Sequence, residues 1–166
     1  MVRTDFSRMR CPVARSMEVL GERWAILVLR EAYYGTTRFD DFLRHLGIAS
    51  NILSARLGKL VEHGVLDRVP APEKGVRHEY RLTEKGRDFF PAYLALKRWG
   101  DRWMAGPEGP VIRLVEADTG HEVAAPPLLD STGAPLALEN LRVLPGPGAG
   151  RAIRQRFSDE RFGNGE

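Results

Sequence analysis

Hydrophobic residues recur at helical spacing through the first hundred residues of the chain, and this spacing predicts a series of helices. Val13, Met17 and Leu20 fall on one face of the segment that begins at Pro12. This pattern predicts an amphipathic helix over 12–20, with proline in the first turn, where its missing N–H is tolerated. Residues 22–34 are apolar on nearly every side, which is typical of a central buried helix.

Two shorter helices with a tight connection between them are predicted next. Thr37 is followed three residues later by Asp40, a capping-box pattern that predicts a helix start, and Gly47 predicts the end of this helix. Ser50 is placed to cap a second helix that runs to His63. Two short helices joined by about three residues that include glycine indicate a helix-turn-helix.

The apolar spacing then changes from helical to extended. Residues 65–69 and 76–82 are predicted to form a hairpin whose tip is rich in proline, glycine and charge. Thr83 is predicted to cap one long helix that ends near Met104. This helix carries more apolar surface than a three-helix core can cover, which favours a dimer interface; the residues concerned are Phe89, Phe90, Tyr93, Leu94, Leu96, Trp99 and Trp103.

Short apolar segments separated by turns follow the long helix and predict a small C-terminal β-rich extension. The strand candidates are residues 111–115, 128–129, 136–138 and 141–144. The predicted fold is therefore mainly α with a small β wing, a winged helix-turn-helix, followed by this extension. The expected division is 1–104 for DNA binding and dimerisation, 105–157 for the extension and 158–166 for a disordered tail.

A winged helix-turn-helix suits duplex DNA, and the sequence offers candidate contacts. The helix over Ser50–His63 is expected to pack one face on the domain and to offer the other to a major groove about 12 Å wide. Asparagine can bond adenine through two hydrogen bonds, small apolar groups can touch a thymine methyl, and cations suit phosphate or guanine. The wing, about Pro70–His78, is expected on the DNA backbone or in the minor groove. The expected contacts are Arg38, Ser50, Asn51, Ile52, Ala55, Arg56, Lys59, Lys74, Arg77 and His78.

Charge and composition support this reading. Residues 1–104 carry 19 basic and 13 acidic side chains, and the sequence pI is about 9.3, which suits a polyanionic partner. No apolar run approaches the ~18 residues that a membrane span requires, and the first residues show no signal-peptide core. With Cys11 as the only cysteine, we expect a cytoplasmic protein without disulfides and without membrane contact.

Signals for enzymatic chemistry are weak. The glycine-rich segment 146–150 superficially resembles a phosphate loop, but a nucleotide fold needs a βαβ unit of about 30 residues and only 16 residues follow Gly150. The four histidines lie at no ligand spacing, and one cysteine cannot form a thiolate-rich zinc site. We therefore expect no catalytic activity, no cofactor and no metal.

The chain resembles the HxlR family of winged-helix regulators over about residues 11–103. The resemblance implies a homodimer formed by the first and last helices, and a regulator, expected here to be a repressor, of neighbouring genes. The sequence departs from the family pattern at Gly58, where a charged residue is more usual. The matching residues are Cys11-Pro12-Val13, Gly21-Glu22-Arg23-Trp24, Arg30-Glu31, Gly35, Arg38-Phe39, Leu53-Ser54-Ala55-Arg56-Leu57, Leu60, Gly64-Val65-Leu66, Glu79-Tyr80-Arg81-Leu82-Thr83-Glu84-Lys85-Gly86, Pro91 and Trp99-Gly100.

The extension resembles a zinc-ribbon-like module that some members of this family carry. The corresponding turns here are Asp118-Thr119-Gly120-His121 and Asp130-Ser131-Thr132-Gly133, and neither contains cysteine. The prediction is therefore a metal-free module.

Two alternatives to plain DNA recognition remain open at this point. One is a ligand- or redox-sensing regulator, in which a small-molecule effector binds aromatic residues at the dimer seam or an oxidant reacts at Cys11. A helix N-terminus and nearby arginines favour the reactive thiolate, whereas a packing cysteine would be inert. The other alternative is a winged helix that binds a protein partner and not DNA.

Overall fold

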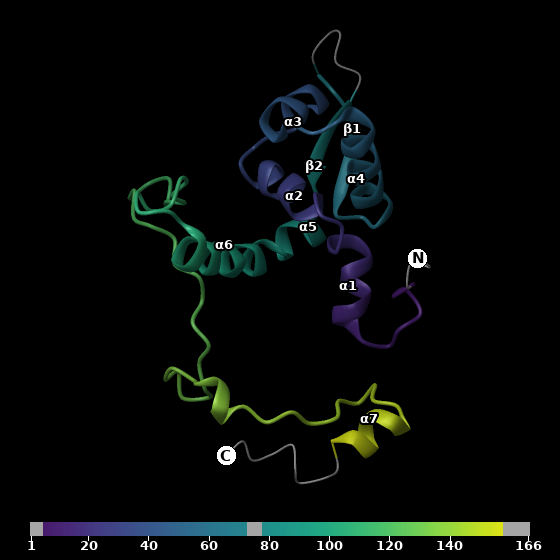
Figure 1. The fold of residues 1–166 in the computed structure, drawn as a ribbon, viewed down its shortest axis with the longest axis vertical. Coiled ribbons are helices and arrows are strands. Elements are labelled where there is room, and N and C mark those ends of the chain that lie inside the picture. The colour runs from purple at the N-terminus through teal and green to yellow at the C-terminus, as the bar shows by residue number, and fades with distance from the viewer. Residues whose placement is uncertain (1–4, 73–77, 158–166) are drawn as a thin grey trace. The chain divides into compact units, whose positions relative to one another are not determined.

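The computed structural model describes residues 5–72 and 78–157, and its described part is mainly helical (Figure 1). These residues form two compact units that divide between Ala125 and Pro126. The elements in chain order are α1 (Pro12–Leu20), α2 (Ala25–Tyr33), α3 (Phe39–Leu46), α4 (Ser50–Glu62), β1 (Leu66–Pro70), β2 (His78–Leu82), α5 (Glu84–Asp88), α6 (Phe90–Met104), a 3-10 helix (Leu138–Asn140) and α7 (Arg151–Arg156). No helix in these described ranges is long and apolar enough to cross a membrane.

The hydrophobic core lies among α2, α3, α4 and the start of β1. Phe42 of α3 is fully buried, and its ring meets the Tyr80 ring edge-on. One face of α4 buries a leucine in nearly every turn, because residues three and four apart lie on the same side of a helix. The buried core residues are Val28, Leu29, Ala32, Phe42, Leu53, Leu57, Leu60, Val65 and Leu66.

The wing is an antiparallel pair of strands, as the change of period predicted. Leu66 pairs with Leu82 at one end and Pro70 with His78 at the other. The Tyr80 N–H also donates a hydrogen bond to the Thr37 carbonyl at 2.8 Å, which ties β2 to the segment before α3. The helices and this two-stranded wing confirm the predicted mainly α winged-helix class, while residues 73–77 of the predicted tip lie outside the described residues.

The caps predicted at Thr37 and Ser50 are wrong, although most helix bounds agree closely. Arg38, not Thr37, occupies the N-cap of α3, and Ala49, not Ser50, occupies that of α4; neither side chain makes a capping hydrogen bond. Both N-cap residues have extended backbone angles. The stop signal at Gly47 is confirmed, because this glycine adopts φ +62°, a left-handed conformation that strains other residues.

The single long helix predicted from Thr83 to Met104 is two helices. Thr83 does cap α5, since its Oγ1 accepts the Gly86 N–H at 3.0 Å, but α5 ends at Asp88. Pro91 in the first turn of α6 explains the break, because proline has no N–H to donate and its ring clashes with the preceding turn.

An aromatic cluster joins α6 to α2 beyond this break. The Tyr33 ring lies 5.0 Å from Phe90 and 5.2 Å from Tyr93, centroid to centroid. The Tyr34 and Tyr93 hydroxyls are hydrogen-bonded at 2.7 Å. Burial raises the pKa of Tyr33 to about 12, and burial together with the Tyr34 hydroxyl raises the pKa of Tyr93 well above its ordinary value. The Tyr33 and Tyr93 phenols therefore stay neutral at ordinary pH.

The β-rich extension predicted over 105–157 does not form a sheet in the described residues. Its only strand-like pairs are isolated bridges, Val115 with Glu122 and Leu129 with Pro135, on either side of the two predicted turns. Residues 136–144, predicted as strands, contain the 3-10 helix instead. Around the second bridge, Pro126, Pro127 and Pro135 have no N–H to donate to a strand ladder, which limits pairing there. The tail 158–166, predicted to be disordered, lies outside the described residues.

Candidate nucleic-acid interface

The outward face of α4 is made of small and polar residues. The inward face carries Leu53, Leu57 and Leu60, each fully buried, so α4 is held firmly against the core. The exposed residues opposite them are Ser50, Asn51, Ser54, Ala55, Gly58 and Glu62. The structure therefore places Ser50, Asn51 and Ala55 outward, as predicted, whereas Ile52 is half-buried at the edge of this face.

The two cations of α4 do not point outward, which corrects their predicted orientation. The Arg56 guanidinium lies 3.0 Å from the Glu22 carboxylate, and the Lys59 ammonium lies 3.6 Å from Glu18. All four side chains are only about one-fifth exposed. The prediction from helical spacing missed these ion pairs because it considers α4 alone. The two glutamates come from α1 and from the turn that follows it.

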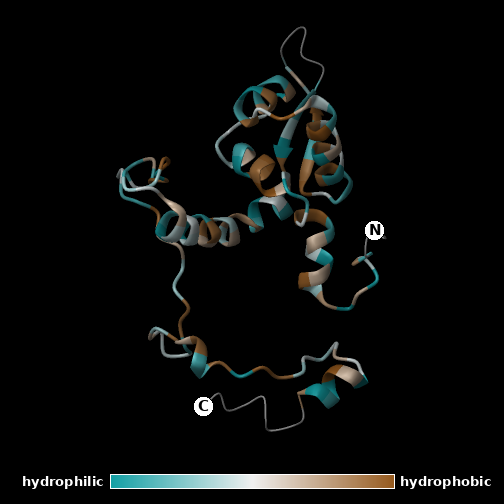
Figure 2. Cartoon of the chain, viewed as in Figure 1, coloured by the Kyte–Doolittle hydropathy of each residue, from teal (hydrophilic) through white to brown (hydrophobic). Residues whose placement is uncertain are grey.

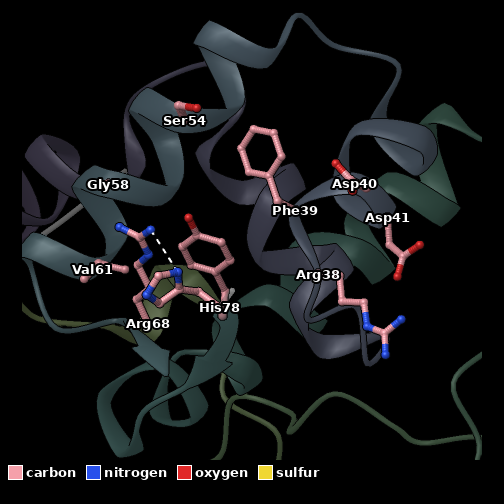
Figure 3. Close-up of a pocket in the computed structure, with 10 residues that line it drawn as sticks. Arg38, Phe39, Asp40, Asp41, Ser54, Gly58, Val61, Arg68 and His78 are labelled. Atoms are coloured by element: carbon pink, nitrogen blue, oxygen red, sulfur yellow. Dashed lines mark hydrogen bonds between the residues drawn. The ribbon is translucent and has the colours of Figure 1, made fainter. Parts of the chain in front are cut away.

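A cleft of about 730 Å³ lies beside the exposed face of α4. Ser54, Gly58 and Val61 of α4 line one side, while the start of α3 and the strands of the wing supply the remaining walls (Figure 3). Ser54 has a small side chain and Gly58 has none, so the cleft reaches close to the α4 backbone. Ser54 was not among the predicted contacts, although it lies one helical turn from both Ser50 and Gly58.

Cationic side chains stand at the rim of this cleft. On the strands of the wing, the Arg68 guanidinium and His78 Nδ1 are hydrogen-bonded at 3.1 Å, and both residues line the cleft. Figure 3 shows Arg38 on the opposite side, with its guanidinium pointing away from this pair. Arg68 was not predicted as a contact, because sequence reasoning looked for charge at the hairpin tip and not on the strand.

The remaining predicted residues fall elsewhere. Lys74 and Arg77 lie outside the described residues. Cys11 occupies the N-cap of α1 and is exposed in the single chain. Among the described residues, no group of three or more histidine, cysteine, aspartate or glutamate side chains is placed to hold a metal ion.

Comparison with known proteins places this geometry in a family. The model of the HxlR-like helix-turn-helix family matches residues 19–107. Rv3095 of Mycobacterium tuberculosis, named as an HTH-type transcriptional regulator, is 45% identical over 136 residues, which cover 82% of this chain and 86% of that protein. The regulator sll1512 of Synechocystis is 37% identical over 95 residues, which cover 57% and 70%.

Solved structures give the same result. The crystal structure of PA1607, described as a candidate transcription factor, matches with a TM-score of 0.78 and 46% identity over 84% of this chain and 98% of that one. The oxidised form of the redox regulator HypR matches with a TM-score of 0.53 and 30% identity over 58% of this chain and 100% of that one. With a family match over more than half of its length and a relative this similar, the chain belongs to the HxlR-like helix-turn-helix family of transcriptional regulators.

Proposed function

We propose that this protein is a sequence-specific regulator that binds duplex DNA as a homodimer, with α4 in the major groove, and that it represses transcription. The observation that carries the proposal is the exposed face of α4 above the cleft, with arginines at the cleft's rim. Asn51 is proposed to bond a base edge, and Ala55 to contact a thymine methyl. A dimer bound across two half-sites would cover the DNA between them, which supports repression.

Gly58 supports a close approach of α4 to DNA. A Cβ added at this position would meet no atom within 4 Å, so no contact within the domain requires glycine. Glycine inside a helix costs about 1 kcal/mol relative to alanine. Accepting this cost on the exposed face fits a helix whose backbone must come near the groove floor or a phosphate.

The homodimer is supported by exposed apolar residues on α1 and α6. Figure 2 shows hydrophobic segments, in brown, along both helices. Val13 is 70% exposed in the single chain, and Trp103 is 62% exposed. Exposed aromatic and aliphatic side chains of this size are typical of an interface. The exposed apolar residues of these helices are Val13, Met17, Leu96, Trp99, Trp103 and Met104.

The proposal is tested by separating backbone contacts from base contacts. Arg68→Ala should weaken binding to every duplex alike and lower the slope of log affinity against log salt by about one, because one phosphate contact is lost. Asn51→Ala should relax base preference at one operator position, at a cost of about 1–3 kcal/mol there. Binding isotherms on a selected operator and its single-base variants, at several salt concentrations, measure both effects.

Two results would contradict this assignment. Selection from a random duplex library that yields no enriched sequence would exclude sequence-specific binding. A uniform loss of affinity on all duplexes from Asn51→Ala would move Asn51 from a base edge to the backbone. In the first case, a protein partner for the α4 face becomes the better account.

Redox control is a second candidate, favoured by the exposure of Cys11 at the N-cap of α1. The oxidised and reduced structures of the redox regulator HypR also match this chain, each at 30% identity. With one cysteine per chain, two Cys11 thiols could join across the dimer while peroxide is reduced to water. Alternatively, one Cys11 thiol could form a mixed disulfide with a small thiol, again while peroxide is reduced to water.

Mild peroxide treatment is therefore expected to change operator affinity at least about fivefold, the lower end of ordinary allosteric coupling. The physical reason is that a new bond at the start of α1 changes how the two subunits meet. Cys11→Ser should abolish the response without altering untreated binding. An unchanged affinity in wild-type protein that still titrates one free thiol per chain would reject redox control.

A further inference from the structure

Both cationic side chains of α4 are engaged by acidic residues from outside that helix. Arg56 NH2 lies 3.0 Å from Glu22 Oε2, in the turn after α1, and Lys59 Nζ lies 3.6 Å from Glu18 Oε2 on α1. The other oxygen of Glu18 accepts the Phe6 N–H at 2.7 Å, which fixes that carboxylate from its far side. Two separate ion pairs therefore connect α4 to α1 and to the turn that follows it.

These pairs differ from ordinary surface salt bridges in their burial. Each of the four side chains is about one-fifth exposed, and the Arg56 Nε is buried without a hydrogen-bond partner among the described residues. A guanidinium in this position depends on its one carboxylate partner, because removing that partner leaves a largely buried cation uncompensated. To reach a phosphate, Arg56 would first have to leave Glu22.

We propose that Glu18 and Glu22 are positioning residues that hold Lys59 and Arg56 away from DNA, so that α4 meets the groove without a cation of its own. This inference rests on the proposed function. Lysine and arginine bind phosphate whatever the sequence, and each such contact adds to affinity for all duplexes. By withholding two cations, the glutamates lower affinity for non-operator DNA and leave discrimination to base contacts of Asn51, Ser54 and Ala55. They act as specificity-determining residues without touching DNA.

The test is the salt dependence of binding by Glu22→Gln. Glutamine keeps the size of glutamate but removes the charge that retains Arg56, so the guanidinium becomes available to a phosphate. The slope of log affinity against log salt should steepen by about 0.9, the value for one added phosphate contact, which is about a further threefold loss between 50 and 200 mM salt. Affinity for random duplex should rise more than affinity for the operator, so the ratio of the two falls.

Three controls separate a positioning role from a merely structural or general charge effect. Glu62→Gln removes the same charge from an exposed site of α4 that has no ion pair among the described residues, and should leave the slope unchanged. Arg56→Gln alone should also leave the slope unchanged, because Arg56 does not contact phosphate in the wild type. The double variant Glu22→Gln/Arg56→Gln should return the slope to the wild-type value.

Several outcomes would overturn the inference. A fall of about one in the slope with Arg56→Gln would show that Arg56 already binds phosphate. An unchanged slope in folded Glu22→Gln would show a purely structural pair. If Glu22→Gln fails to fold, Glu18→Gln tests the same idea independently through Lys59. Wild-type protein that binds no duplex would contradict the proposed function itself, a result distinct from wild-type binding with unaltered slopes.

Discussion

Replacing Val13 by aspartate is expected to convert the protein to a monomer and to lower operator affinity by about 100-fold or more. Val13 is 70% exposed in the single chain, so the aspartate costs little in the folded monomer. In a dimer that covers α1, however, it would bury an unpaired charge. When one subunit of a dimer has bound its half-site, binding of the other subunit is intramolecular, which raises the affinity of the dimer for the operator. A monomer loses this increase in affinity. Sedimentation velocity measures the first effect and operator titration the second.

Arg15→Asp is the matched control, because it places the same residue on the opposite side of α1. It should remain dimeric. A Val13→Asp protein that still sediments as a dimer would mean that the subunits pair through a surface other than α1.

Gly86→Ala is expected to have the largest effect on the stability of the fold. A Cβ at this position would lie 2.3 Å from the Val65 carbonyl oxygen, so α5 and the start of β1 would have to separate. The same glycine donates its N–H to Thr83, and its carbonyl accepts the Tyr33 hydroxyl at 2.7 Å, so the shift would strain both bonds. Overpacking of this kind costs about 3 kcal/mol, or roughly 6–12 °C in Tm for a chain of this size.

Gly58→Ala is the control for this variant, since its Cβ meets nothing within 4 Å. Without DNA, it should be as stable as the wild type or up to about 1 kcal/mol more stable, because alanine favours the helix. The Tm values of wild type, Gly86→Ala and Gly58→Ala, measured by thermal unfolding at equal protein concentration, test both expectations. Equal melting temperatures for Gly86→Ala and wild type would contradict the packing described here.

The helices and the wing could be predicted from the sequence because each depends on local spacing. The leucines of α4 recur every three or four residues, and Gly47 ends α3 as its freedom at positive φ predicts. The helix starts were harder to predict. Thr37 and Ser50 have capping side chains, yet the chain enters both helices one residue away from each, at Arg38 and Ala49.

The surface proposed to face DNA was only partly predictable, because the pairing of its cations with carboxylates depends on tertiary packing. Asn51 and Ala55 follow from the helical wheel, since an apolar stripe fixes the opposite face. The ion pairs of Arg56 and Lys59 cannot be predicted from the helical wheel, because they depend on where α1 packs. The break before α6 was foreseeable from Pro91, and the failed strands of the extension from its prolines.

The buried core cluster comes from α2, α3, α4 and β1, whereas the proposed pairing surface lies on α1 and α6. Within the described residues, the positions that form the core and those proposed to pair subunits are thus different. After gene duplication, one copy could acquire substitutions at Val13 or Trp103 that prevent mixed dimers with its parent, at little cost to its own folding. Related regulators in one genome could in this way each form only homodimers, so that each controls its own operators.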